Sequence, residues 1–122
     1  MEKKINRVRE DLEPKIVEVL SPIFGERFYP EVAPQKPVPS YPYGIYQLTG
    51  ERIYKSSNCE PQTEVSIQID IYALTVALRS SLVKRVRDEM AKIGGKFSAL
   101  RQMTFEKEIR THRASLDFEF IF

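Results

Sequence analysis

The clearest pattern in the chain is an alternation of apolar and polar side chains from Glu64 to Ala73. Its apolar members occupy every second position: Val65, Ile67, Ile69 and Ile71. A period of two predicts a strand with one buried face. From Thr75 to Ile93 the spacing changes to three and four residues, which predicts an amphipathic helix. Its apolar stripe consists of Leu78, Leu82, Val86 and Met90. A half-buried strand that runs into such a helix predicts the core of a small layered domain.

The ends of this helix and a second helix are also predicted by local signals. Thr75 is a suitable N-cap, and Gly94-Gly95 ends the helix, with Lys92 placed well for the helix dipole. Residues 3–20 form the other predicted helix, in which Pro14 introduces a kink or begins a shorter second helix. The apolar positions of this segment recur at helical spacing: Ile5, Val8, Leu12, Ile16 and Val19.

Between residues 30 and 42 the chain is unusually rich in proline. The prolines are Pro30, Pro34, Pro37, Pro39 and Pro42. Such spacing excludes a helix or a central strand and favours an extended, polyproline-like arm over the surface. The spacing of Pro34 and Pro37 also suits a ligand for a proline-reading module. We favour a connecting arm, because the segment lies between structured elements.

Three further segments have the pattern of strands. Tyr43 to Ile53 is apolar on both faces, with Tyr43 and Ile45 on one and Tyr46 on the other. Residues 96–101 form a link to two closing strands, 103–109 and 114–122, joined by a short turn at Arg110-Thr111-His112. We therefore predict an α+β fold over residues 1–122. It has a four-stranded sheet, mainly antiparallel or mixed, two α-helices, a long hairpin loop and the proline-rich arm.

Composition narrows the class of protein. The chain has 122 residues, 42% hydrophobic and 30% charged, which is typical of one globular domain. Nineteen basic and seventeen acidic residues leave a net charge of +2, too small to indicate a dedicated nucleic-acid binder. Cys59 is the only cysteine, so an intramolecular disulfide and a cysteine-based zinc site are excluded. No apolar run suits a membrane span or a secretory signal, so we expect a cytosolic protein where it is made.

A search for chemistry along the chain finds no catalytic pattern. His112 is the only histidine, and no serine or cysteine motif lies near it. Asp70, Asp117 and Glu119 fall on the polar phase of their strands, where a solvated or interface face is the ordinary interpretation. Gly94-Gly95 lacks the spacing of a phosphate-binding loop. We expect no enzyme activity, no catalytic residue, no metal site and no cofactor.

Nucleic-acid recognition receives limited support. The second helix carries basic residues, and tyrosines accompany Arg52 and Lys55, but Asp88 and Glu89 interrupt the basic side. A face of mixed charge is usually solvated, so we expect no specific nucleic-acid recognition. The residues that raise the possibility are Lys84, Arg85, Arg87, Lys92, Tyr43, Tyr46 and Tyr54.

The order of these elements resembles a known family, the small bacteriophage tail-completion proteins related to the tail terminators of long-tailed phages. The resemblance covers about residues 3–122 and rests on four stretches taken in order. They are Phe24-Gly25-Glu26-Arg27-Phe28-Tyr29-Pro30, Tyr41-Pro42-Tyr43-Gly44-Ile45-Tyr46-Gln47, Val65-Ser66-Ile67-Gln68-Ile69-Asp70-Ile71-Tyr72-Ala73 and His112-Arg113-Ala114-Ser115-Leu116-Asp117-Phe118-Glu119-Phe120. Pro14 and the richness of the proline arm depart from the family pattern.

The resemblance implies a single tail-terminator-like domain and a structural role. Similar proteins form a hexameric ring on the head-proximal end of the tail tube, stop its polymerisation and join the tail to the head connector. The implied partners are the tail tube protein, the connector (stopper) protein and further copies of the chain, with no membrane. The implied location is the host cytoplasm during assembly and then the virion at the head–tail junction, with a prophage as one source of the gene.

On this interpretation, the long loop Ile53–Thr63 meets the tail tube or its lumen. The polar face of the strand 64–73 is a second place for a partner. The residues proposed for these contacts are Arg52, Lys55, Asn58, Glu60, Gln68 and Asp70. Tyr46, Tyr72 and Ile121 suggest an apolar ring patch, or else a second covered sheet face. Two other functions stay open: a head-completion or neck adaptor protein, and a cellular protein-binding module that shares only the fold.

Overall fold

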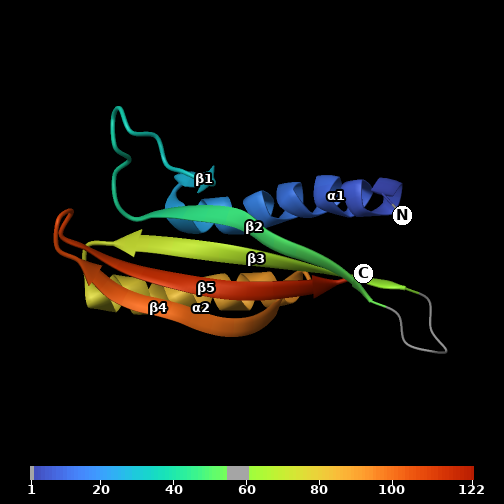
Figure 1. Ribbon diagram of the computed structural model, residues 1–122. Coiled ribbons are helices and arrows are strands. Elements are labelled where there is room, and N and C mark those ends of the chain that lie inside the picture. The colour runs from blue at the N-terminus through green and yellow to red at the C-terminus, as the bar shows by residue number, and fades with distance from the viewer. Residues whose placement is uncertain (1, 55–60) are drawn as a thin grey trace.

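The computed structural model describes residues 2–54 and 61–122 of the chain and contains one sheet with both helices on the same face (Figure 1). Strand order across the sheet is β1-β2-β3-β5-β4. The helices are α1 (Glu2–Leu20), the short 3-10 helix η1 (Ser21–Phe24) and α2 (Val76–Lys92). The strands are β1 (Phe28–Pro30), β2 (Tyr43–Tyr54), β3 (Gln62–Ala73), β4 (Lys96–Glu106) and β5 (Thr111–Ile121).

Strand β3 occupies the centre of the sheet, as its alternation suggests. It pairs antiparallel with β2 on one side and with β5 on the other. Its four predicted core side chains, Val65, Ile67, Ile69 and Ile71, are each at most 1% exposed. Because β3 has neighbours on both edges and helices over its apolar face, its period-two pattern becomes the middle of the core.

Helix α2 begins and ends where the sequence predicts. Thr75 is the N-cap, and its Oγ1 accepts a hydrogen bond of 3.1 Å from the backbone N–H of Leu78. The helix ends at Lys92, and Gly94 follows with a φ of +91°, a conformation that side chains of L-residues rarely adopt. The apolar stripe is buried at Leu82, Val86 and Met90, whereas Leu78 in the first turn is 37% exposed.

Helix α1 is one continuous helix with Pro14 in its interior. Leu12, Ile16 and Leu20 are buried against the same core as β3. η1 then brings aromatic rings into this core: Phe28 stacks on Phe24 at 5.6 Å and on Tyr46 at 4.9 Å between ring centroids. Tyr46 is therefore part of the helix-side core, and the suggestion that it contributes to a ring patch is wrong.

The prediction of four strands is wrong, because the sheet has five strands and is mixed. β1 pairs parallel with β2, with Phe28 opposite Gly44. A Cβ atom at Gly44 would lie 2.8 Å from the rings of Phe24 and Phe28, so only glycine allows this close approach. The strand has three residues and ends in Pro30, so no periodicity could reveal it. The α+β class and the two helices are as predicted.

Strand β4 also differs from the prediction. It begins at Lys96 rather than Met103, so the expected link 96–101 is half of the strand. Its register with β5 shifts twice, between Phe97 and Ala99 and between Leu100 and Gln102. These bulges break the alternation, which is why the pattern does not identify the first half as a strand. Residues 107–110 form a turn. Lys107 and Ile109 were expected in the strand 103–109 and belong instead to this turn.

No helix in the described part of the chain is long and apolar enough to cross a membrane.

Candidate interaction surfaces

The sheet face opposite the helices carries a small aromatic cluster beneath the proline arm. Tyr43 and Ile45 of β2 are buried together with Ala33 of the arm. Tyr43 stacks on Tyr72 of β3 at 4.8 Å and lies 5.3 Å from Tyr41. Burial is the main cause that raises the pKa of Tyr43 to about 12. At neutral pH the Tyr43 phenol is therefore uncharged, and the cluster fixes the base of the arm to the sheet.

A buried polar network lies beside this cluster and centres on Asp70. Its Oδ1 accepts hydrogen bonds from Gln68 Nε2 at 3.1 Å and from the Ser115 hydroxyl. Its Oδ2 accepts a hydrogen bond of 3.3 Å from Arg113 Nη2, and the Asp70 side chain is only 8% exposed. The carboxylate thus has partners at both oxygens, as a buried charge requires.

Arg113 connects this network to the edge of the molecule. Its Nη1 lies 3.6 Å from Glu106 Oε1, and its guanidinium lies 5.6 Å from the centre of the Tyr72 ring. Burial by itself lowers the pKa of Arg113, but Asp70, Tyr72 and Glu106 outweigh it and raise the pKa. A cleft of about 430 Å³ extends from Arg113 and Asp70 to the inner side of the arm at Val38.

The edge of the sheet formed by β4 exposes apolar side chains. Leu100 pairs with Leu116 and Met103 with Ala114, so these side chains are on the helix side of the sheet. They are nevertheless 46% and 42% exposed, because β4 is the last strand and α2 covers it only in part. Phe105, 49% exposed, packs its ring at 4.9 Å from that of His112. We call Leu78, Leu100, Met103 and Phe105 the β4 patch.

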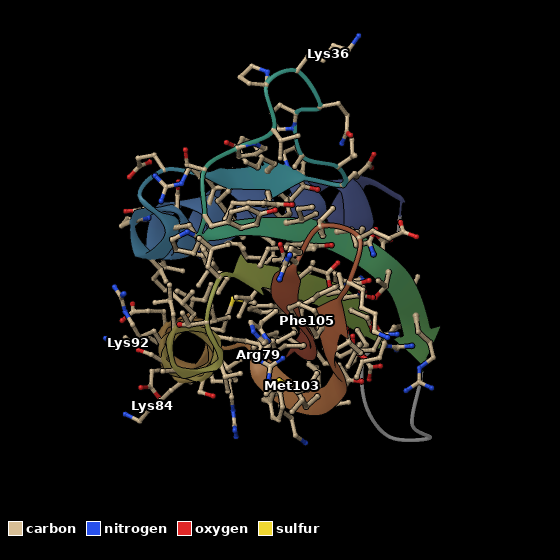
Figure 2. All side chains as sticks on the ribbon, turned by 90° about the vertical axis from the view of Figure 1, so that its left-hand side faces the viewer. Lys36, Arg79, Lys84, Lys92, Met103 and Phe105 are labelled. Atoms are coloured by element: carbon tan, nitrogen blue, oxygen red, sulfur yellow. The ribbon has the colours of Figure 1, made fainter. Side chains whose placement is uncertain are left out.

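The charged side chains of α2 mostly contact their own neighbours. Lys84 lies 3.6 Å from Asp88, and Lys92 lies 2.8 Å from Glu89. The Arg87 guanidinium is 4.0 Å from the centre of the Phe97 ring, and Arg79 donates a hydrogen bond of 3.2 Å to the Thr104 carbonyl. Arg79 therefore holds the first turn of α2 beside β4, as its position next to Met103 and Phe105 shows (Figure 2).

The structure places three of the six proposed contact residues. Arg52 is exposed and pairs with Glu64 across β2 and β3 at 3.2 Å. Gln68 and Asp70 belong to the buried network, so Asp70 reaches a partner only through the cleft or through Arg113. Lys55, Asn58 and Glu60 lie outside the described residues. Of the described residues, Arg52 pairs with Glu64, whereas Gln68 and Asp70 belong to the network with Ser115 and Arg113.

Two groups of residues were missed by the sequence analysis. Arg113 has no local signal, since its partner Asp70 is 43 positions away. Leu100 was expected in a link and Met103 in a closing strand, and only their place on the last strand of the sheet makes them exposed. Among the described residues, no group of three or more His, Cys, Asp or Glu could hold a metal ion.

Comparisons with known proteins give one finding about the fold. No protein-family model matches the chain, and no curated protein matches it. Among solved structures, the chain is similar to a chain in the structure of the virion of a native gene transfer agent (GTA) particle. The match covers 83% of this chain and 81% of that chain, with a TM-score of 0.51 and 17% sequence identity. At this identity the likeness shows a shared fold.

Proposed function

We propose that this chain is a structural component of a phage-like virion. The single observation that carries the proposal is the fold that it shares, over more than four-fifths of both chains, with a chain of a gene transfer agent virion. The four sequence stretches that resemble the tail-completion family support the same class of protein independently. An assembly role also suits a molecule with exposed apolar side chains at both ends of its sheet.

Within that class we propose a tail terminator. A ring of six copies binds the head-proximal end of the tail tube, blocks further polymerisation and presents its other side to the head connector. The chain acts by binding and has no enzyme activity. A ring needs two different patches on every subunit, one for each neighbour. The residues of the hairpin between β2 and β3, with Arg52 at its base, are the proposed contact with the tube.

Electron microscopy of tails made with and without the protein tests this function. We expect tubes of irregular, extended length and unjoined heads when the gene is deleted. Tubes of normal length in its absence would contradict capping. A pull-down with tagged protein separates the two virion roles, because a terminator retains the tail tube protein, whereas a neck adaptor retains only head connector proteins.

The hairpin is tested separately by a deletion of residues 55–61 bridged by a short glycine linker. Because β2 and β3 remain paired by their register from Tyr43 to Tyr54, we expect a folded protein that no longer limits tail length. Circular dichroism and thermal unfolding check the fold. Normal tail length and head joining with this variant would exclude the hairpin as the tube contact.

A further inference from the structure

A groove of about 620 Å³ separates helix α2 from the edge strand β4. The two elements touch at two points. Arg79 Nη1 donates a hydrogen bond of 3.2 Å to the Thr104 carbonyl, and the Arg87 guanidinium lies 4.0 Å from the centre of the Phe97 ring. We call this hollow the α2–β4 groove. The residues that line it are Ser80, Val83, Lys84, Arg87, Asp88, Ala91, Gly95 and Phe97.

The groove exists because β4 bows away from α2 between these two contacts (Figure 1). Residues 79 and 87 are about 12 Å apart along a helix. Residues 97 and 104 are about 23 Å apart along a straight strand. Two bulges, at 97–99 and 100–102, bend β4 over this longer path. Leu100 and Met103 lie on the bowed part and are 46% and 42% exposed, so α2 leaves the helix side of β4 partly uncovered.

We propose that the α2–β4 groove binds an amphipathic helix of another protein, with an apolar stripe and acidic flanks. The stripe packs on Leu100, Met103 and Phe105, and the helix extends the layer that α1 and α2 form over the sheet. Both helices of this chain bury their own stripes in the core, so neither can fill the groove in the folded protein. The inference goes beyond the proposed tail role, because it concerns a separate partner and requires no ring.

Charge indicates the acidic flanks of the partner. Lys84 and Arg87 line the groove, Arg79 lies at its end, and Asp88 is the one acidic residue in the lining. The Lys84 side chain lies 3.6 Å from Asp88 but is 82% exposed, so it can also meet a carboxylate of a partner. Residues 76–110 contain nine Lys or Arg and four Asp or Glu, whereas the rest of the chain contains ten and thirteen. This basic region attracts an acidic helix and repels the same region of a second copy.

A helix suits this surface better than an added strand does. Strand addition needs a regular edge with free backbone groups. β4 is bulged twice, and its Thr104 carbonyl already accepts a hydrogen bond from Arg79. What β4 exposes is its side-chain face: Leu100 and Met103 pair with Leu116 and Ala114, which belong to the buried helix side of β5. An apolar face with a basic flank matches the surface of an amphipathic helix.

Binding of a synthetic helix to the purified full-length protein tests the proposal. The probe is a fluorescein-labelled peptide of about 18 residues, or five helical turns, with leucines at spacings of three and four and glutamates on both flanks. The control peptide has lysine in place of every glutamate. By fluorescence anisotropy we expect the acidic peptide to bind at least about tenfold more tightly, with an advantage that falls as salt is added. Equal affinities, or no binding of the acidic peptide, would overturn the proposal.

Matched variants identify the surface. Lys84→Glu should weaken binding of the acidic peptide at least about fivefold, because it reverses a charge beside the groove. Arg85→Glu makes a similar change on the side of α2 that faces Glu18 and should stay within about twofold. Both residues are exposed, so both variants should fold, which circular dichroism checks. Equal effects of the two variants would exclude the groove as the binding site.

The apolar contact has its own pair of variants. Leu100→Asn should weaken binding at least about tenfold, because it places an amide in the contact. Ile121→Asn changes a side chain that is 52% exposed on the sheet face away from the helices, and binding should persist. Unchanged binding by Leu100→Asn would contradict the proposal.

Sedimentation velocity of the protein alone distinguishes the partner helix from a second copy. A dimer that Leu100→Asn dissociates and that excludes the peptide would assign the groove to a second copy and overturn the proposal. Peptide binding needs no tail, so its outcome is separate from that of the proposed function. Normal tails in the deletion strain would exclude capping and leave this site intact, whereas irregular tails without peptide binding would retain capping and exclude the site.

Discussion

Strands β3 and β4 are similar in length and both alternate apolar residues in part, yet their environments are opposite. The branched side chains of β3 (Val65, Ile67, Ile69 and Ile71) are at most 1% exposed, whereas Leu100, Met103 and Phe105 of β4 are more than 40% exposed. The difference comes from position: β3 has a strand on either edge, and β4 has one neighbour and partial cover from α2. Apolar side chains in the central strand of this sheet therefore stabilise the fold. Apolar side chains in the edge strand are left available for contact with a partner.

The largest expected effect is on the core. Ile69→Ala should lower the free energy of unfolding by about 2–5 kcal/mol, because it leaves a cavity in a fully buried layer. Met103→Ala, in the β4 patch, should change it by less than about 0.5 kcal/mol. Urea unfolding of both variants at low protein concentration makes the comparison. Equal losses would mean that β4 belongs to the core as fully as β3 does.

A smaller effect is expected from charged pairs on the same two strands. Asp70→Ala removes a carboxylate that binds Gln68, Ser115 and Arg113 in a buried setting, and should cost about 1–3 kcal/mol. Arg101 of β4 binds Asp117 at 2.7 Å but is 61% exposed, so Arg101→Ala should have only a slight effect. Thermal unfolding of the two variants compares their losses of stability. A greater loss from Arg101→Ala would contradict the ranking.

The smallest effect concerns the second face of the sheet at high pH. Burial raises the pKa of Tyr43 from 10.0 to about 12, so the folded state disfavours the phenolate. Stability from this burial is complete below the unfolded pKa and is lost as pH rises through about 12. A pH titration followed by phenolate absorbance makes the comparison. The Tyr43→Phe variant should lack one tyrosine that titrates near pH 12 in the unaltered protein. Loss of a tyrosine that titrates near its ordinary pKa would show that the cluster does not bury Tyr43.

Much of the fold could be predicted because its main signals are local. The alternation of β3, the stripe of α2, the Thr75 cap and the glycine after Lys92 each depend on residues within one or two turns or strand repeats. The functional surfaces could be predicted less well. The hairpin and the arm are visible as breaks in periodicity, but Asp70 was expected to face a partner and is instead the centre of the buried network. Nothing near it in the sequence indicates Arg113.

By itself the sequence determined the two helices and the central strand, and which face of β3 and α2 is buried. Periodicity is a property of neighbouring residues, and the apolar surface of each element must be covered in any fold. Only the tertiary structure decided which strands become edges. The parallel pairing of β1, the two bulges of β4 and the exposure of Leu100 and Met103 all depend on segments far apart in the chain. Such pairings are chosen by total packing, which no local pattern records.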